Sequence, residues 1–253
     1  MLKEAQEDNP MKSRLSTTFV MIVASVAITV SLPALAEQPT FSSRPASYVG
    51  SSPVLPPPGD PVNLVLDDGV LENNIGLNST SSATQFLWLN RFSPTEFPIE
   101  VSRIDIWWAS VGTGIVGGES IELVVYEGGA DPCTGATTIV GGELRTIGSL
   151  DTFEQYLLGT PAPVNVGPSI DLAVIDRWVV SGVTPPTYPA AIDTTATQGR
   201  SYVASWSADP PSPPVLPSDG LCGLIDSFDF PGNWLLRGAG TVVPVELMGM
   251  SVE

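Results

Sequence analysis

Short apolar runs, interrupted by glycine, proline, asparagine and aspartate, set the pattern of the chain from residue 62 onward. The runs are rich in β-branched and aromatic residues, which favour strands. They predict strands at 62–66, 84–92, 101–109, 119–127, 152–158, 169–180, 201–206, 223–228, 233–238 and 241–247. After residue 36 no stretch carries a 3.6-residue apolar stripe of helical length. The pattern therefore predicts one all-β domain, an antiparallel β-sandwich.

Alternation within the runs predicts which side chains face the core. In the run VSRIDIWWAS, the even-numbered Ile104, Ile106 and Trp108 share one face of the strand. The odd-numbered positions place Trp107 beside a charged pair on the opposite face. The run at 121–127 alternates in the same way. A sheet with one buried and one solvated face gives this pattern, so we expect the second face to be in contact with solvent or to lie under a loop.

The first 36 residues resemble a secretory signal. Basic residues precede a twelve-residue apolar run at 19–30, and Ala-Leu-Ala at 34–36 supplies a cleavage pattern. The run is shorter than the about 20 residues of a membrane-spanning helix. Because residues 1–10 are acidic, Met11 is the alternative start. Cleavage would give a secreted or cell-surface chain without membrane insertion; an uncleaved N-terminal anchor is the other interpretation.

Proline content marks the ends of the domain. Residues 37–61 are rich in proline and serine and predict an extended linker, which places the sandwich domain at 62–247. Residues 248–253 then form a tail, which we interpret as a truncated junction to a further module. Two long proline-rich connections, 181–200 and 207–220, predict loops that either have a function or cover a sheet edge.

The charge of the chain excludes several partners and reactions. After residue 36 it retains 10 − 3 = 7 arginines and 27 − 3 = 24 acids, with no lysine and no histidine, so its net charge is −17. Such a surface repels nucleic acids and anionic lipid headgroups. Without histidine or lysine, the chain has no Ser-His-Asp triad, no Cys-His pair, no imidazole metal ligand and no Schiff-base lysine.

The two cysteines predict a disulfide. Cys133 and Cys222 are the only cysteines, and an exported chain meets oxidising conditions. Their separation would close a long loop, which favours stabilisation in the chain-entropy model. Two buried thiols, or a bond to another chain, are the alternatives.

The stretch LVLDDGVLENNIGL, at 64–77, predicts either a calcium site or a turn. Asp67, Asp68, Glu72 and Asn73 offer several hard oxygen ligands within a short loop, as calcium prefers, although the spacing is not that of an EF-hand. Aspartate, asparagine and glycine also end strands through ordinary turn chemistry. Structural calcium is therefore the one cofactor that we consider, with turn chemistry as the alternative.

Aromatic and acidic residues supply the other candidates. Trp107, Tyr188 and Trp206 are the candidate ligand-binding aromatics, because an exposed ring can stack on a sugar. The remaining tryptophans in apolar strands are predicted to lie in the core: Trp88, Trp108, Trp178 and Trp234. The acids inside predicted strands are the candidates for carboxylate chemistry: Asp105, Glu122, Asp176 and Asp226. Two arginines, Arg200 and Arg237, are predicted to pair with buried acids such as Asp193 or Asp226.

Several segments together resemble an uncharacterised domain of exported bacterial proteins. These are LDDGVLENNIGL, FLWLNRF, GVTPPTYPAAIDTTATQGRSYV, FPGNWLLRGAG and VPVEL, which cover roughly 62–247. In that group an Asp-Asp-Gly strand end opens the domain and a Gly-Asn-Trp-x-x-Arg strand closes it. The resemblance implies a jelly-roll-like β-sandwich of the kind found in accessory and adhesion-like modules. It implies no activity.

The sequence thus supports three functional hypotheses. The first is a non-enzymatic, exported surface module that binds a glycan or a cell-surface protein. The second is a carbohydrate-active hydrolase that uses two carboxylates. The third is a structural subunit of an extracellular assembly, in which the N-terminal arm or VPVEL completes the sheet of a neighbour.

Overall fold

The computed structural model describes residues 41–46, 62–78, 85–134, 138–165, 167, 169–177, 187–216 and 221–244. All of them lie in one compact unit, Glu37–Glu253. The predicted signal 1–36, the predicted tail 248–253 and Trp178 lie outside the described residues.

The larger face of the fold is a six-stranded antiparallel sheet. Its strands, in spatial order, are β12 (Leu221–Leu224), β11 (Ser201–Trp206), β4 (Gln85–Phe92), β9 (Ser169–Asp176), β6 (Ser120–Gly128) and β7 (Thr138–Thr146). The central strands β4 and β9 are buried along their whole length. This continuous burial shows that both faces of the sheet are covered.

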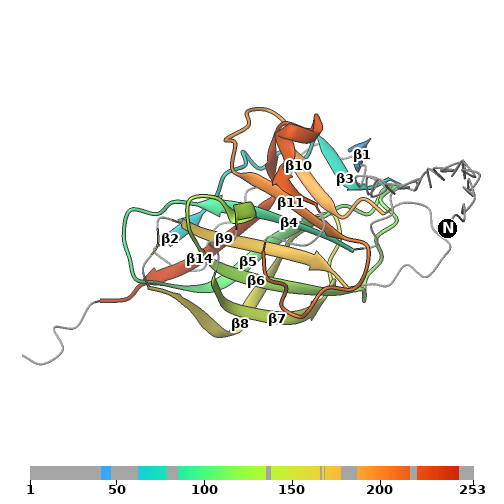
Figure 1. The fold of residues 1–253 in the computed structure, drawn as a ribbon. Helices are drawn as coiled ribbons and strands as arrows, with labels where there is room; N and C mark the ends of the chain where they lie inside the picture. Colours follow the sequence, from blue (N-terminus) through green and yellow to red (C-terminus); the bar gives the residue numbers. More distant parts are fainter. Residues whose placement is uncertain are drawn as a thin grey trace, which may run out of the picture. The chain divides into compact units, whose positions relative to one another are not determined.

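A four-stranded antiparallel sheet forms the second layer (Figure 1). Its order is β2 (Val62–Leu64), β14 (Leu236–Val242), β5 (Ile99–Trp108) and β8 (Thr152–Val164). One apolar core joins the inner faces of the two sheets, with Trp88 from β4 and Trp108 from β5 in edge-to-face contact. The predicted all-β, antiparallel sandwich is confirmed, as is the core position of Ile104, Ile106 and Trp108.

A third, small sheet was not predicted. It contains β1 (Phe41–Pro45), β3 (Asn73–Leu77), β10 (Ala190–Asp193) and β13 (Asn233–Trp234). β1 lies inside the stretch that composition assigns to a linker, and β10 lies inside the predicted loop at 181–200. Both are short strands whose pairing comes from distant segments rather than from a local apolar pattern.

The outer faces of β5 and β6 are largely buried, so of the two expectations for the second face, solvent or a covering loop, the structure shows the covering loop. On β5 the outer Trp107 packs against Phe153, Leu71 and Leu235, so a cluster from the loop before β3 and the residue before β14 covers it. On β6 the outer Tyr126 lies under the proline-rich segment after β11 and donates to the carbonyl of Pro214. Long connections cover what the alternation alone would leave in water.

Two short 3₁₀ helices interrupt the strands, η1 (Pro132–Thr134) and η2 (Ile225–Phe228). η2 corrects the strand predicted at 223–228. Its turn is held locally, because the Ser227 hydroxyl donates to the Leu224 carbonyl and the Asp229 N–H donates to the Asp226 carbonyl. Such local bonds compete with strand pairing in a run that is apolar enough to resemble a strand.

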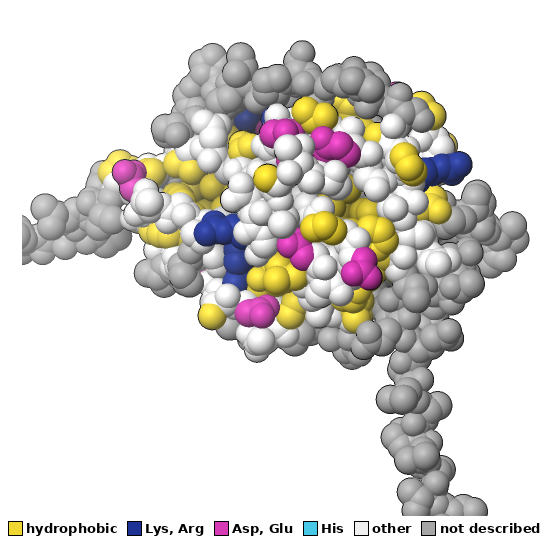
Figure 2. Space-filling model, turned by 90° about the horizontal axis from the view of Figure 1, so that it is seen from above, with side chains coloured by type: hydrophobic (Ala, Val, Ile, Leu, Met, Phe, Trp, Pro, Cys, Tyr) yellow, Lys and Arg dark blue, Asp and Glu magenta, His cyan; other side chains and the backbone are white. Residues whose placement is uncertain are grey.

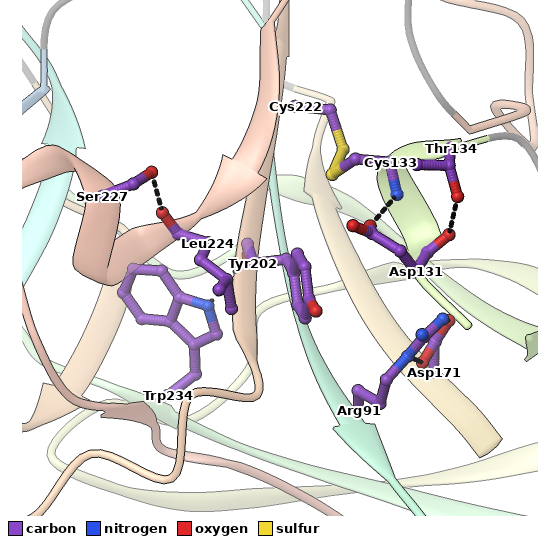
Figure 3. Close-up of a disulfide and its surroundings, with 10 residues drawn as sticks. All are labelled: Arg91, Asp131, Cys133, Thr134, Asp171, Tyr202, Cys222, Leu224, Ser227 and Trp234. Atoms are coloured by element: carbon purple, nitrogen blue, oxygen red, sulfur yellow. Dashed lines mark hydrogen bonds and ion pairs between the residues drawn. A yellow bond between two sulfur atoms is a disulfide. The ribbon is translucent and has the colours of Figure 1, made fainter. Parts of the chain in front are cut away.

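The predicted disulfide is present between Cys133 in η1 and Cys222 on β12. It links residues 89 positions apart. Figure 3 shows the bond at one end of the six-stranded sheet, near the ring of Tyr202. The loop that carries Cys133 is held by Asp131, whose carboxylate accepts from the Cys133 N–H.

Candidate functional site

The Asp-Asp-Gly loop meets the closing strand through a buried ion pair. Asp67 and Arg237 are 170 residues apart, and the guanidinium donates from Nε to both carboxylate oxygens and from Nη2 to Oδ1. Both side chains are nearly inaccessible to solvent. The guanidinium also lies over the ring of Phe153, 4.2 Å from its centroid. Arg237 thus binds Asp67, not the Asp193 or Asp226 expected from sequence.

The other acids of this loop tie it to the turn after β10. The Asp68 N–H donates to Asp193 at 2.9 Å. Glu72 accepts from the N–H of Thr194 at 2.7 Å and from the hydroxyl of Thr195 at 3.1 Å. These bonds join two segments more than 120 residues apart. The carboxylates therefore hold the loop in place.

Local turn bonds use the remaining oxygens of the candidate calcium ligands. The Asp67 Oδ1 also accepts from the Gly69 N–H, and the Asp68 Oδ1 accepts from the Val70 N–H. The Asn73 Oδ1 accepts from the N–H of Asn74. Within the described ranges, no three acidic or cysteine side chains come together as a metal site. In this structure Asp67, Asp68 and Asn73 act in local turns, and Glu72 binds the turn after β10.

The Gly-Asn-Trp stretch completes the same network. The side-chain amide of Asn233 accepts from the Gln198 N–H at 2.9 Å and donates to the Ala196 carbonyl at 2.7 Å. Trp234 is fully buried, and its indole N–H donates to the Tyr202 carbonyl. A Cβ at Gly232 would come within 2.5 Å of the Asp193 carbonyl oxygen. The opening and closing motifs therefore hold the turn after β10 between them.

Two of the three candidate sugar-binding aromatics are buried. Trp107 is 2% exposed and Trp206 is 7% exposed, each within an apolar cluster, so the expectation that they present open faces is wrong. Tyr188 is half-buried, and the guanidinium of Arg44 on β1 lies over its ring. Trp107 and Trp206 are buried because other segments cover them, and strand alternation does not reveal those segments.

The strand acids also have partners inside the fold. Asp105 pairs with Arg103, and Glu122 pairs with Arg177, with all four side chains buried or nearly so. Asp226 accepts from the Thr197 hydroxyl at 2.8 Å. Partners that satisfy a buried charge are what its burial requires. These acids are structural in the geometry observed.

A further buried pair lies beside the disulfide and was not singled out from the sequence. Arg91 donates two bonds to Asp171, each 2.7 Å long, and Figure 3 shows this pair below the Tyr202 ring. Burial lowers the pKa of Arg91, but the hydrogen bonds and charge of Asp171 outweigh it and the net pKa is raised. The run FLWLNRF contains Arg91, so its charge inside an apolar strand was the available signal.

Asp176 is a buried acid of a different kind. It is 5% exposed at the end of β9, and its carboxylate accepts from the Phe86 N–H at 3.1 Å. Burial raises the pKa of Asp176 to about 8. The group is therefore largely protonated at neutral pH.

Two pockets lie beside edge strands of the sheets. One has a volume of about 250 Å³ and lies between β7 and β8, with Val140, Leu158 and Glu143 in its wall. The other, of about 200 Å³, lies beside β2; its wall is formed by Val62, Asn63, Leu64, Val65, Leu66, Phe92, Ser93, Pro94 and Arg200. Neither pocket brings together the two acids that a glycosidase needs.

Arg200 is the one arginine in the wall of either pocket. Gly199, with a φ of +62°, turns the chain immediately before Arg200, and the Arg200 carbonyl accepts from the Arg91 N–H. The predicted pairing of Arg200 with Asp193 or Asp226 is not found: Asp193 binds Asp68 and Thr195, and Asp226 binds Thr197.

Comparison with known proteins gives only partial matches. No family model matches the chain, and no curated protein matches it. A crystal structure of the cysteine protease and lectin-like domains of Cwp84, a surface layer associated protein of Clostridium difficile, aligns with a TM-score of 0.46 and 12% identity over 74% of this chain. A structure of the clostridial protease Cwp84 after propeptide cleavage aligns with a TM-score of 0.44 and 9% identity over 68%.

The chain spans 37% and 44% of the length of those two chains. Similarity this low says nothing about function. Among the residues that the structure describes, no helix has the length and hydropathy to span a bilayer.

Proposed function

We propose that this chain is an exported, non-enzymatic surface module that binds protein rather than glycan. One observation carries the proposal: the side chains that suggested catalysis or calcium, and two of the three aromatics that suggested sugar stacking, have partners inside the fold. Asp67 binds Arg237, Glu122 binds Arg177, and Trp107 lies in an apolar cluster. What remains at the surface is a different chemistry.

The exposed large apolar side chains of the described residues are aliphatic. They are Val65, Val70, Val111, Val116, Leu144, Leu157 and Val215. Sugar recognition commonly uses aromatic faces, whereas aliphatic side chains beside sheet edges suit contact with protein chains. Figure 2 shows acidic side chains spread over one face with apolar atoms between them, a mixture that resembles ordinary protein–protein surfaces.

The disulfide and the signal pattern support export. A bond between Cys133 and Cys222 persists in oxidising compartments and is rare in the cytosol. The charge of −17 supports a soluble partner that is not itself strongly acidic overall.

The test compares three screens on the purified chain 37–253. A phage-displayed library of random peptides should yield enriched binders, whereas a glycan array should give no signal above an unrelated β-sandwich. Hydrolysis assays on polysaccharides and on casein should show no turnover. A reproducible glycan signal, or turnover of either substrate, would contradict the proposal.

A further inference from the structure

The seven arginines of the exported chain divide into two groups. Five of them form ion pairs with acids: Arg91, Arg103, Arg145, Arg177 and Arg237. A sixth, Arg44, donates to the carbonyl of Gly112 and lies over Tyr188. Arg200 alone makes no side-chain hydrogen bond or ion pair with the described residues, in a chain that carries 24 acids after residue 36.

The surroundings of Arg200 form a pocket with one sign of charge. The pocket beside β2 has Arg200 and no acidic residue in its wall. Phe92 is 4% exposed and provides an apolar base, and Asn63 and Ser93 add polar side chains. An arginine in the wall of a concave, partly apolar site is suited to bidentate binding of a carboxylate.

The pocket lies along β2, which is an edge strand among the residues that the structure describes. β2 pairs with β14 on one side, and within the described residues it has no neighbour on the other. Alternate residues of an edge strand direct their N–H and C=O groups away from the sheet, where an extended peptide can pair with them. Val65, which follows β2, is 47% exposed and belongs to the pocket wall. Backbone pairing and a charged pocket are therefore adjacent.

We infer that β2 and the Arg200 pocket together bind an extended peptide that carries an acidic side chain. The peptide lies along the free edge of β2, and its carboxylate binds the Arg200 guanidinium. This inference rests on the proposed protein-binding function and specifies its site and ligand class. Because the chain as a whole is acidic, association is opposed at long range and depends on this local charge.

Fluorescence anisotropy with a labelled peptide tests the inference. The probe is acetyl-Val-Thr-Val-Asp-Val-Thr-amide, and its partner replaces Asp by Asn. We expect the Asp peptide to bind the chain at least 10-fold more tightly than the Asn peptide at low salt. Equal binding of the two peptides, or no binding of the Asp peptide, would overturn the inference.

Variants place the site. Arg200→Gln should weaken the Asp peptide by at least 10-fold and leave the Asn peptide unchanged, and Arg200→Lys should restore part of the loss because it keeps charge without the bidentate geometry. Arg145→Gln, a solvent-accessible arginine at the opposite edge, is the matched control and should bind like the parent chain. An Arg200→Gln chain that binds as tightly as the parent would contradict the assignment, provided that circular dichroism shows it folded.

Two further measurements test the pairing with β2 and the proposed protein-binding function separately. Free N-acetylaspartate amide should bind far more weakly than the peptide, since it lacks backbone to pair with β2; equal affinity would contradict the strand arrangement. The peptide library separates this inference from the proposed function. Enriched peptides that are indifferent to Arg200→Gln would overturn the site and leave the protein-binding function intact, whereas a library without enrichment would overturn that function.

Discussion

The edge formed by β7 and β8 differs from the edge strand β2 in how its charged side chains are used. Between β7 and β8, the chain closes the edge with its own side chains: Glu143 accepts from the Gly159 N–H, Arg145 donates to the Leu157 carbonyl, and the two side chains pair at 2.7 Å. Pro161 and Pro163 further remove backbone donors from β8. Beside β2, by contrast, a guanidinium lies in a pocket wall without a described partner.

This difference distinguishes charged side chains that pair within the fold from one that is available to a ligand. Closing an edge with charged side chains and prolines is how β proteins avoid unwanted pairing. The chain does this between β7 and β8, whereas beside β2 the described residues provide neither a partner for the Arg200 guanidinium nor a second neighbour for the strand. Three buried ion pairs instead join segments at least 55 residues apart: Arg91–Asp171, Arg177–Glu122 and Arg237–Asp67.

The largest expected effect comes from breaking an interior pair. Arg237→Ala leaves the carboxylate of Asp67 buried without its partner, so we expect a loss of about 3–5 kcal/mol in the free energy of unfolding. Denaturant-induced unfolding monitored by tryptophan fluorescence measures this. The double variant with Asp67→Asn should recover part of the loss; a single variant as stable as the parent would show that the pair is not structural.

The pH dependence of stability should differ from that of peptide binding, because Asp176 determines the first and the Arg200 pocket the second. The pKa of Asp176 is raised in the folded chain, so its contribution to stability is complete below about pH 3.8 and is lost as the pH rises through about 8. The free energy of unfolding should therefore fall across this window by at most about 1.4 kcal/mol per pH unit.

Asp176→Asn should flatten that dependence, because the amide cannot ionise and its oxygen still accepts from the Phe86 N–H. Stability measured at pH 5, 7 and 8.5 decides the point. Peptide binding should instead change near pH 4, where a peptide aspartate ionises. Parallel slopes for parent and variant would contradict the assignment of Asp176.

Breaking the ion pair between β7 and β8 should have a small effect on stability. Arg145→Gln removes a partly exposed ion pair and one bond to the Leu157 carbonyl, for which we expect a loss of about 0.2–1 kcal/mol. Chemical unfolding in low and high salt measures it, and the loss should shrink in high salt. A loss as large as that of Arg237→Ala would place this pair with the interior ones.

Replacing Arg200, beside β2, should have the smallest effect on stability. Arg200→Gln removes no described bond, so the free energy of unfolding should stay within about 0.5 kcal/mol of the parent value. The same unfolding assay serves as the measurement. A loss beyond about 2 kcal/mol would reveal a structural partner for Arg200 and remove the contrast between the two edges.

The strands and the disulfide could be predicted because their signals are local or few. Apolar runs place β4 and β6 almost to the residue, and two cysteines in an exported chain leave few pairings. The partners of Asp67 and the burial of Trp107 could not be predicted. The partner of Asp67 is 170 residues away, and Trp107 is covered by Leu71 and Leu235 from two separate segments, which the apolar pattern does not bring together.

The predicted pairing of Arg200 with Asp193 or Asp226 was wrong for a related reason. The sequence offered several acids as partners, among them Asp193 and Asp226, and single-sequence patterns contain no information on which of them other groups already bind. Only the three-dimensional arrangement shows that Asp193 and Asp226 accept from Asp68 and from Thr197.

Arginine side-chain NMR tests the contrast between paired and unpaired arginines most directly. In the ¹⁵N-labelled chain 37–253, the Nε–H groups of Arg91, Arg103, Arg177 and Arg237 all donate to carboxylates and should exchange slowly with water, whereas that of Arg200 should exchange fast. On titration with the acetyl-Val-Thr-Val-Asp-Val-Thr-amide peptide, one arginine signal, absent from the Arg200→Gln spectrum, should shift and slow. If every arginine signal stays unchanged, or if the signal of Arg145 shifts instead, the open edge beside β2 is not the binding site.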